Sequence, residues 1–182
     1  AGEFRGGVGM PVEIEIKLKI DDFAPLRDRL RSVGAALIGN VLETNIFFDT
    51  PDGSLYPTDR GLRIRRSHPI AGGDDRIQIT YKGPRQPGKI KQREEIELTI
   101  DDLDMAVALL NRLGYVRTLC FEKRRESWRF ESSKVELDEL PRLGRFVEIE
   151  SPDASSVQRV RTLLVLDSAI LVPETYAQLV GG

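Results

Sequence analysis

An unbroken alternation of aliphatic and charged residues, over residues 12–20, is the feature that most constrains the fold of this chain. Side chains of a β-strand alternate between two faces, so the aliphatic residues share one face and the charged residues share the other. The charged face carries two carboxylates and then two ammonium groups, namely Glu13, Glu15, Lys17 and Lys19. Carboxylates can hold a hard divalent cation, and ammonium groups can hold phosphate. This strand therefore has one face for a core and one face for either water or a charged ligand.

The composition is that of a charge-rich globular protein of 182 residues with a formal net charge of −2. The length is compatible with one domain and a buried core. The small net charge argues against a protein that binds nucleic acid through overall basicity. The sequence contains no apolar run long enough to span a membrane and no apolar segment typical of a secretion signal. We therefore expect a cytoplasmic protein whose partners are neither nucleic acids nor membranes.

The first nine residues differ in character from the rest of the chain. Residues 1–9 read as a glycine-rich leader, of which residues 1–4 have the composition of a cloning remnant. We expect Met10 to be the natural start and residues 10–182 to form a single domain without long linkers or tandem repeats.

The chain has one cysteine, Cys120, and one histidine, His68, which excludes an internal disulfide and a metal site made of Cys and His. Any metal must be held by oxygen ligands, which points to Mg²⁺, Mn²⁺ or Ca²⁺. The count alone allows a Cys–His nucleophilic pair. However, Cys120 stands between Leu119 and Phe121, and His68 precedes Pro69. We therefore expect a buried strand thiol and an exposed loop imidazole.

Alternation and helical periodicity divide the rest of the chain into strands and helices. Strands are predicted over residues 12–20, 35–50, 61–67, 76–82, 90–100, 116–130, 134–139 and 145–150. Helices are predicted over residues 21–33, 101–113, 154–166 and 174–179. Paired aspartates precede the first two helices, and Gly34 and Gly114 follow them, which are typical start and stop signals of helices.

Several of these strands carry charge of a single sign on their polar face. The basic pairs are Arg63 with Arg65 and Lys123 with Arg125, and the acidic pairs are Glu136 with Asp138 and Glu148 with Glu150. A solvated sheet face with scattered ion pairs explains any one of these strands. It explains the set less well, because a solvated face would mix the two signs and include Ser, Thr, Gln and Asn.

The location of the charged faces follows from what the helices need. Helices bury their apolar stripe against the apolar face of a sheet, which leaves the charged faces inside a curved or closed sheet. Charges there are costly unless each meets an opposite charge, a metal ion or a ligand. A polyphosphate with divalent cations is the simplest such ligand, because Arg and Lys bind phosphate oxygens and carboxylates bind the metal. An interaction protein whose charged sheet faces solvent is the alternative.

The motif Glu13-x-Glu15-x-Lys17 resembles the ExExK signature of the CYTH family, the triphosphate tunnel metalloenzymes. The motif alone is weak, because many strands could show it, whereas the ordered set of segments that follows it is specific. The likeness covers nearly the whole of residues 10–180. The further segments that carry it are Phe48-Asp49-Thr50-Pro51, Leu62-Arg63-Ile64-Arg65, Thr80-Tyr81-Lys82-Gly83-Pro84, Arg93-Glu94-Glu95-Ile96-Glu97, Lys123-Arg124-Arg125, Leu137-Asp138-Glu139-Leu140, Gly144-Arg145-Phe146-Val147-Glu148-Ile149-Glu150 and Thr175-Tyr176-Ala177.

The resemblance implies an α+β fold in which an eight-stranded antiparallel β-barrel forms a tunnel, with helices packed on the outside. It implies a triphosphate-bearing small molecule, such as tripolyphosphate or ATP, as the partner, and Mg²⁺ or Mn²⁺ as the cofactor. The residues expected to bind the triphosphate are Lys17, Arg63, Arg65, Lys82, Lys123 and Arg125. The residues expected to hold metal ions are Glu13, Glu15, Asp138, Glu148 and Glu150. Lys17, Glu148 and Glu150 are the expected catalytic residues.

For other residues of the matching segments, the resemblance predicts a location but no definite role. Those that face the tunnel without an assigned role are Lys19, near its mouth, Arg93, Glu95 and Glu97. Arg66, Glu94 and Arg124 are interpreted as outward charges at the surface or at a dimer contact. Residues 48–50 are interpreted as a structural element at a strand end. Members of the family often form dimers, so a homodimer is compatible with the resemblance.

The resemblance leaves three activities open. The first is hydrolysis of the terminal phosphate of inorganic triphosphate or of a nucleoside triphosphate, by in-line attack of water. The second is conversion of ATP to cyclic AMP and pyrophosphate, as in class IV adenylate cyclases. The third is binding of a polyphosphate or nucleotide without catalysis, which would need the cations but not the full set of carboxylates.

Two departures from family patterns favour hydrolysis. The class IV cyclases carry a His-Phe pair shortly before the ExExK motif, whereas this chain has Glu3-Phe4-Arg5-Gly6-Gly7 there. The sequence shows no evident aromatic clamp for a thiamine group either, since the strand alternation places Trp128 on the outward face. Cyclase activity is therefore the second choice.

Overall fold

The structure is a computed structural model that describes residues 14–84 and 94–181. Within these residues the chain forms nine strands and four α-helices. The strands are β1 (Ile14–Ile20), β2 (Ala36–Asp49), β3 (Gly61–Pro69), β4 (Arg76–Lys82), β5 (Glu95–Ile100), β6 (Val116–Phe130), β7 (Ser133–Leu140), β8 (Gly144–Ser151) and β9 (Ile170–Leu171). The helices are α1 (Ala24–Ser32), α2 (Leu103–Arg112), α3 (Ala154–Leu163) and α4 (Tyr176–Gly181), and a short 3₁₀ helix spans Tyr56–Thr58. The α+β class predicted from the sequence is confirmed.

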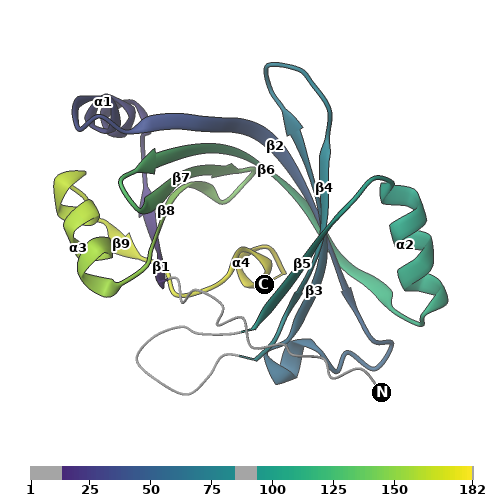
Figure 1. Cartoon of the computed structure of the whole chain (residues 1–182). Helices are drawn as coiled ribbons and strands as arrows, with labels where there is room; N and C mark the ends of the chain where they lie inside the picture. Colours follow the sequence, from purple (N-terminus) through teal and green to yellow (C-terminus); the bar gives the residue numbers. More distant parts are fainter. Residues whose placement is uncertain (1–13, 85–93, 182) are drawn as a thin grey trace, which may run out of the picture.

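All strands belong to one antiparallel sheet with the order β5-β4-β3-β2-β6-β7-β8-β1-β9. The sheet curls so that one face is concave, and α4 lies within the curve (Figure 1). The expectation of a closed eight-stranded barrel is not met, because the pairing of the described strands ends at β5 and β9. The additional strand β9 pairs with the outer edge of β1, which is the edge that a closed barrel would need for β5. The sheet is therefore an open, strongly curved one.

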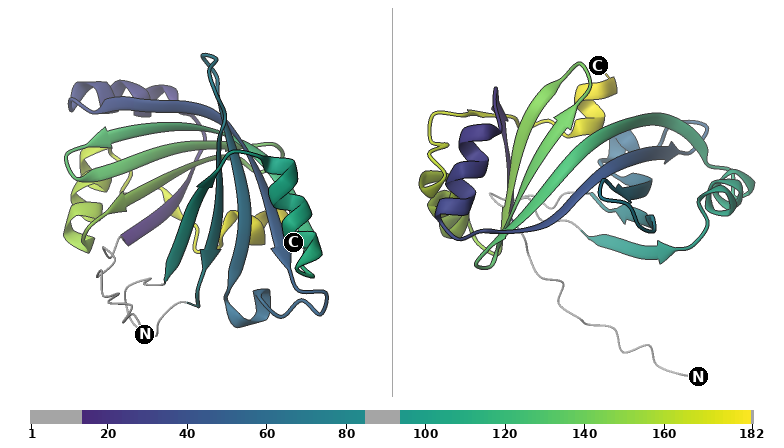
Figure 2. Two further views of the ribbon diagram at one scale, coloured as in Figure 1. Left: turned by 45° about the vertical axis from the view of Figure 1, so that its right-hand side comes forward. Right: turned by 90° about the horizontal axis from the view of Figure 1, so that it is seen from above.

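Helices α1 and α3 lie at one end of the convex face and α2 lies at the other (Figure 2). Each end buries an apolar cluster. The first cluster holds α1 and α3 against β1, β7 and β8, and the second holds α2 against β2, β3 and β4. Leu18, Val135, Val147 and Ile149 of the first cluster are fully buried. Burial of each such side chain contributes about 1.5–3 kcal/mol relative to exposure. The aliphatic half of the strand alternation therefore forms the core, as the sequence predicts, and the charged half is left on the concave face.

The helices begin and end near the predicted signals, and the first three are shorter than predicted. Asp102 caps α2 by accepting a hydrogen bond from the Met105 amide, and Asp153 caps α3 in the same way. The predicted cap of α1 is different, because Phe23 occupies the N-cap position without a side-chain hydrogen bond. The third helix ends at Leu163 rather than at residue 166, because the chain turns through Val165, whose φ is +59°. In the described part of the chain, none of the helices is long and apolar enough to cross a membrane.

Two expectations about single residues need correction. Cys120 lies in strand β6, as predicted, but its side chain is exposed rather than buried. The outward face of a strand is buried only where a helix covers it, and α2 covers β2, β3 and β4 rather than β6. His68 is exposed, as predicted, but it lies within strand β3 rather than in a loop, and its Nδ1 is 2.6 Å from Oδ1 of Asp75.

The segment around Asp49 has the structural role that the sequence suggests. The Asp49 carboxylate accepts hydrogen bonds from the backbone amides of Thr50, Leu55 and Tyr56, at 2.7–3.1 Å. These bonds fasten the turn after β2 and hold the pKa of Asp49 below its ordinary value, although partial burial opposes the shift. The segment therefore ends a strand and positions the loop after it.

Candidate functional site

The concave face of the sheet forms a groove with a volume of about 920 Å³. The strands from β1 to β8 contribute its walls, and residues 56–60 and 172–178 contribute the remainder. All six residues expected to bind a triphosphate line this groove: Lys17, Arg63, Arg65, Lys82, Lys123 and Arg125. Three of the five expected metal ligands line it as well: Glu15, Glu148 and Glu150. The sheet therefore brings to one place side chains that are spread over most of the sequence.

Antiparallel register explains how charges of opposite sign meet in the groove. Lys17 of β1 lies directly opposite Glu148 of β8, and Arg125 of β6 lies opposite Asp138 of β7. Directly opposed residues of an antiparallel pair have Cβ atoms about 4.5–5.5 Å apart, so their charged ends interact. Lys17 and Arg125 thus each have a carboxylate as a cross-strand neighbour.

Arg125 is the centre of a buried ion cluster formed by β6, β7 and β8. Its guanidinium contacts the carboxylates of Glu136, Asp138 and Glu148. Lys123 Nζ lies 2.9 Å from Asp138 Oδ2, and Asp138 is fully buried. Burial by itself would raise the pKa of Asp138, but Arg125 and Lys123 outweigh it and hold that pKa well below its ordinary value. Asp138 is therefore a permanently ionised partner of two cations.

Glu148 has the opposite pKa shift although it contacts the same arginine. Burial raises the pKa of Glu148, and the attraction of Arg125 does not offset this effect, partly because Glu15 is a like charge nearby. Its second cationic neighbour, Lys17, is 3.4 Å away. Glu148 is thus the buried carboxylate that would gain most from an additional positive charge in the groove.

Two buried polar residues of β2, Glu43 and Asn45, belong to the site although the sequence analysis did not select them. Glu43 Oε2 lies 3.4 Å from Arg65 Nε and 3.5 Å from Lys123 Nζ. Burial opposes ionisation of Glu43, but Lys123, Arg125 and Arg65 lower its pKa to about 2. Asn45 Oδ1 accepts a hydrogen bond of 3.1 Å from Arg65 Nε. The available signal was the spacing of Glu43 and Asn45 two positions apart in a predicted strand, which places both on one face of β2.

Arg63 has a different environment from the other cations of the groove. Its Nε is buried and has no hydrogen-bond partner among the described residues. Burial and the neighbouring charge of Arg65 lower the pKa of Arg63 to about 9, so the guanidinium remains protonated at neutral pH. Lys82, by comparison, is 2.6 Å from Glu95. Arg63 is therefore a cation with a buried donor that is ready for a ligand.

The segment before α4 approaches the cations from the open side of the groove. Lys17 Nζ donates a hydrogen bond of 2.9 Å to the carbonyl oxygen of Glu174. The ring of Tyr176 has its centroid 3.9 Å from Lys17 Nζ and 4.6 Å from Lys123 Nζ. Burial raises the pKa of Tyr176, and the nearby carboxylates of Asp138 and Glu148 raise it further. In the sequence, Tyr176 stands out only as part of a segment that matches the family, and no role is predicted for it.

An aromatic pair lines the groove, which the sequence analysis did not foresee. The rings of Phe47 and Phe121 stack with a centroid distance of 5.8 Å and an interplanar angle of 19°. Phe47 lies next to Asn45 on the concave face of β2, and Phe121 lies directly opposite Asn45 on β6. Both phenylalanines sit in predicted strands, so the missing information was which face of β2 points inwards. Trp128, by contrast, packs in the convex core as predicted.

Several predicted residues lie elsewhere or are not described. Glu13 and Arg93 lie outside the described residues. Lys19 interacts with the carbonyl oxygen of Leu143, in the β7–β8 turn, and with the ring of Phe146, rather than with the groove. Glu95 and Glu97 line the groove on β5 and pair with residues of β4. The roles of all these residues stay predictions.

The groove offers suitable atoms for a divalent metal ion. Glu15, Glu136, Glu148 and Glu150 line it from adjacent strands, and carboxylate oxygens are the ligands that Mg²⁺ and Mn²⁺ prefer. Glu15 lies directly opposite Glu150, and Glu136 lies opposite Glu148. Over residues 14–84 and 94–181, however, no three acidic, His or Cys side chains converge on one point. The donor atoms therefore fit a hard cation, but some of them now pair with Arg125, Lys17 and Lys134.

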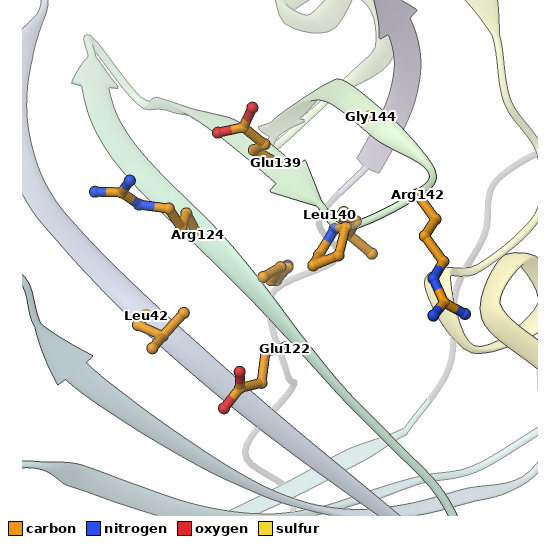
Figure 3. Close-up of a pocket in the computed structure, with 9 residues that line it drawn as sticks. Leu42, Glu122, Arg124, Glu139, Leu140, Arg142 and Gly144 are labelled. Atoms are coloured by element: carbon orange, nitrogen blue, oxygen red, sulfur yellow. The ribbon is translucent and has the colours of Figure 1, made fainter.

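A second, smaller cavity of about 590 Å³ lies around the β7–β8 turn (Figure 3). Leu42, Glu122, Arg124 and Glu139 border it from the outward positions of β2, β6 and β7, and Arg142 borders it from the turn. Apart from Lys123, which it shares with the groove, its charged side chains are exposed or half-exposed, whereas the groove is lined by the buried charges of Lys17, Lys123, Arg125, Glu136 and Glu148. Solvated charges interact weakly with a ligand, so the groove is the better candidate for chemistry.

Comparisons with known proteins agree on one family. The sequence model of the CYTH domain family matches residues 11–171. A relative from Methanocaldococcus jannaschii, named a "putative adenylate cyclase", is 33% identical over 139 residues, which cover 76% of each chain. The solved structure of the PH1819 protein from Pyrococcus horikoshii has a TM-score of 0.78 at 29% identity, covering 92% of this chain and 97% of its own. A structure from Hippeastrum, described as a "putative adenylyl cyclase" with a dominant triphosphatase activity, shares the fold with a TM-score of 0.70 at 20% identity, covering 93% of this chain and 94% of its own.

Proposed function

The chain belongs to the CYTH domain family, and we propose that it is a metal-dependent enzyme that hydrolyses the terminal phosphate of a triphosphate substrate. The observation that carries the proposal is the arrangement of six cations from four strands around one groove: Lys17, Arg63, Arg65, Lys82, Lys123 and Arg125. A triphosphate is a compact polyanion, and buried guanidinium and ammonium groups bind phosphate oxygens through strong charge-assisted hydrogen bonds. The triphosphatase activity described for the Hippeastrum protein is consistent with this reaction class.

The present partners of each cation determine which of its donors could bind the substrate. Arg63 would donate its buried Nε to a phosphate oxygen without giving up a hydrogen bond within the described residues. Lys17 would exchange the carbonyl oxygen of Glu174 for a phosphate oxygen. Arg65 and Lys123 would keep Glu43 and Asp138 as fixed partners and use their remaining donors. The carboxylates thus orient the cations towards the substrate.

The acidic wall of the groove would hold Mg²⁺ or Mn²⁺. Glu15, Glu148 and Glu150 are the described residues suited to this task, and Glu13 is the further ligand expected from the motif. When bound, the ion would act as a Lewis acid that polarises a phosphoryl oxygen and activates water. The ion would add a positive partner next to Glu148, which would offset the cost of burying the charge of Glu148.

Cyclisation of ATP is the second candidate, and the name of the Methanocaldococcus jannaschii relative favours it. Both reactions use the same cations and differ in which phosphorus atom meets the nucleophile. In hydrolysis, water attacks the terminal phosphorus and releases phosphate. In cyclisation, the ribose hydroxyl attacks the α-phosphorus and releases pyrophosphate.

A metal-dependent substrate panel tests the proposal. The protein is incubated with tripolyphosphate, ATP, GTP or thiamine triphosphate, with Mg²⁺, with Mn²⁺ or with a chelator. Phosphate, pyrophosphate and cyclic nucleotide are then measured separately. We expect phosphate as the main product, and none with the chelator. Cyclic AMP and pyrophosphate from ATP would establish the cyclase, and binding without any product would establish a non-catalytic binding protein.

A further inference from the structure

We propose that Phe47, Phe121 and Asn45 form a subsite for a flat heteroaromatic group, so that the groove prefers an organic triphosphate, such as a nucleoside triphosphate, over inorganic triphosphate. This inference rests on the proposed function, because it names the class of triphosphate that the same groove would take. Two observations support it: an aromatic residue that lies outside the buried apolar clusters of the described residues, and a buried amide whose donor has no partner among them.

Phe47 is the aromatic residue in question. The three buried apolar clusters of the described residues do not include it, although it lies between Ile46 and Phe48, which are core residues. Its side chain is half-buried and lines the groove, and its ring stacks on Phe121. Phe121, in turn, packs against the cluster of Leu140, Phe146 and Tyr176. One ring is thus fixed by the protein core, and the other is presented to the groove.

Asn45 supplies a hydrogen-bond donor beside these rings. Its side chain is 1% exposed, and its Nδ2 has no hydrogen-bond partner among the residues that the structure describes. The orientation of the amide follows from chemistry, because Arg65 Nε can only donate and therefore requires Oδ1 on its side. A buried donor without an acceptor is costly. An acceptor atom of a ligand in the groove would remove that cost.

The position of the subsite relative to the phosphate-binding cations fits one ligand that carries both groups. Phe47 is directly opposite Arg63 on β3, and Asn45 is directly opposite Arg65 on the same strand. A ring stacked at Phe47 would therefore adjoin a phosphate bound at Arg63. The volume of about 920 Å³ corresponds to a drug-sized ligand with an organic part. Stacking on aromatic side chains tolerates different bases, since every base has a π-face.

The test compares an organic and an inorganic substrate in the same variant. We expect Phe47→Leu to lower the ratio of kcat/KM for ATP to kcat/KM for tripolyphosphate by about 10-fold, within the range found when a stacking ring is removed. Phe130→Leu is the matched control, because Phe130 is a half-buried phenylalanine of β6 that packs in the convex core. This variant should leave the ratio unchanged. Thiamine triphosphate, measured in parallel, shows whether the ring is that of a base or of another heterocycle.

Each outcome decides the inference separately from the proposed function. A loss of preference with ATP or with thiamine triphosphate, in Phe47→Leu but not in Phe130→Leu, supports the subsite. A parallel change for all substrates, or an unchanged ratio, overturns it while the triphosphatase remains. If the wild type releases no product, the hydrolysis proposal fails, and the same ratio is taken from dissociation constants of ATP and tripolyphosphate by calorimetry. A ratio that is the same in wild type and Phe47→Leu then overturns the subsite.

Discussion

The two halves of the groove differ in whether their buried donors have partners within the protein. In the half formed by β6, β7, β8 and β1, Arg125, Lys123 and Lys17 each have a carboxylate within 3.4 Å. In the half formed by β2 and β3, Arg65 also has a carboxylate, Glu43, at 3.4 Å. Arg63 Nε and Asn45 Nδ2, however, are buried donors without hydrogen-bond partners in the described part of the chain. The cations of the first half are thus paired within the protein, whereas the second half also presents donors that a ligand can satisfy.

This difference suggests which half contributes to stability and which to binding. A buried ion cluster is a poor source of net stability, but removal of one member leaves the others uncompensated and is strongly destabilising. A buried donor without a partner already reduces stability. Removal of Arg125, the centre of the cluster in the first half, should therefore act strongly on folding, whereas removal of Arg63 in the second half should act mainly on activity.

Arg125→Ala is expected to have the largest effect. The substitution leaves Glu136, Asp138 and Glu148 without their shared cation, so the free energy of unfolding should fall by about 3–5 kcal/mol. Urea denaturation measures this change. Arg124→Ala is the control, because Arg124 is the next residue of β6, points to the opposite face and is exposed. It should change stability by less than about 0.5 kcal/mol. Equal effects of the two substitutions would contradict the importance of the cluster.

Arg63→Ala should separate activity from stability. Loss of a preorganised donor to the reacting group commonly lowers kcat by about 10²–10³-fold, and we expect a loss of this size in phosphate release from tripolyphosphate. The free energy of unfolding should change by less than about 1 kcal/mol, since a buried guanidinium next to Arg65 is removed. Arg66→Ala, on the outward face of the same strand, is the control. Full activity together with a strong loss of stability in Arg63→Ala would reverse the roles of the two halves.

Glu43 lies between the two halves, and its ionisation makes the free energy of unfolding depend on pH. Its pKa is about 2 in the folded protein against an ordinary value of 4.5, so its ionised form stabilises the fold. This contribution is fully present above pH 4.5 and is lost as the pH falls towards 2. Wild type should therefore exceed Glu43→Gln in unfolding free energy by about 3 kcal/mol near pH 6, and the difference should shrink at low pH.

Urea denaturation of both proteins at several pH values checks this prediction about Glu43. Glu122→Gln serves as the control, because Glu122 is an exposed glutamate on the outward face of the neighbouring strand β6. Its difference from wild type should be small at every pH. A difference between wild type and Glu43→Gln that stays constant down to pH 2 would show that charge is not the source of the stabilisation.

The sequence predicted the parts of this molecule that depend on local periodicity. Alternation placed Lys17, Arg65 and Glu148 on the face opposite to the aliphatic core, and the structure places all three in the groove. The strand limits were close as well, because each strand ends at a turn or helix signal. The resemblance added the order of the motifs, and the family is confirmed.

The parts that depend on distant contacts were not predictable in this way. Strand β9 has only two residues, and it forms because β1 offers a free edge, which no local pattern records. The exposure of Cys120 depends on which strand a helix covers. Glu43 and Asn45 lie in a strand whose polar face mixes charged, amide and aromatic groups, so it lacks the single sign that made other strands stand out. Curvature of the sheet then decides that these residues face the cations.

Tyr176 gives the smallest expected effect and tests the boundary between the groove and α4. Its ring lies over Lys17 Nζ and Lys123 Nζ, and its hydroxyl oxygen has no hydrogen-bond partner among the described residues. Tyr176→Phe keeps the ring, so stability should change by less than about 0.5 kcal/mol, whereas Tyr176→Leu should lose about 0.5–2 kcal/mol of cation–π interaction and packing. Thermal and urea unfolding of the two variants measure the difference. Equal losses would mean that the hydroxyl bonds to Asp138, the buried carboxylate that contributes to the raised pKa of Tyr176. The paired half of the groove would then extend through Tyr176 into the segment before α4.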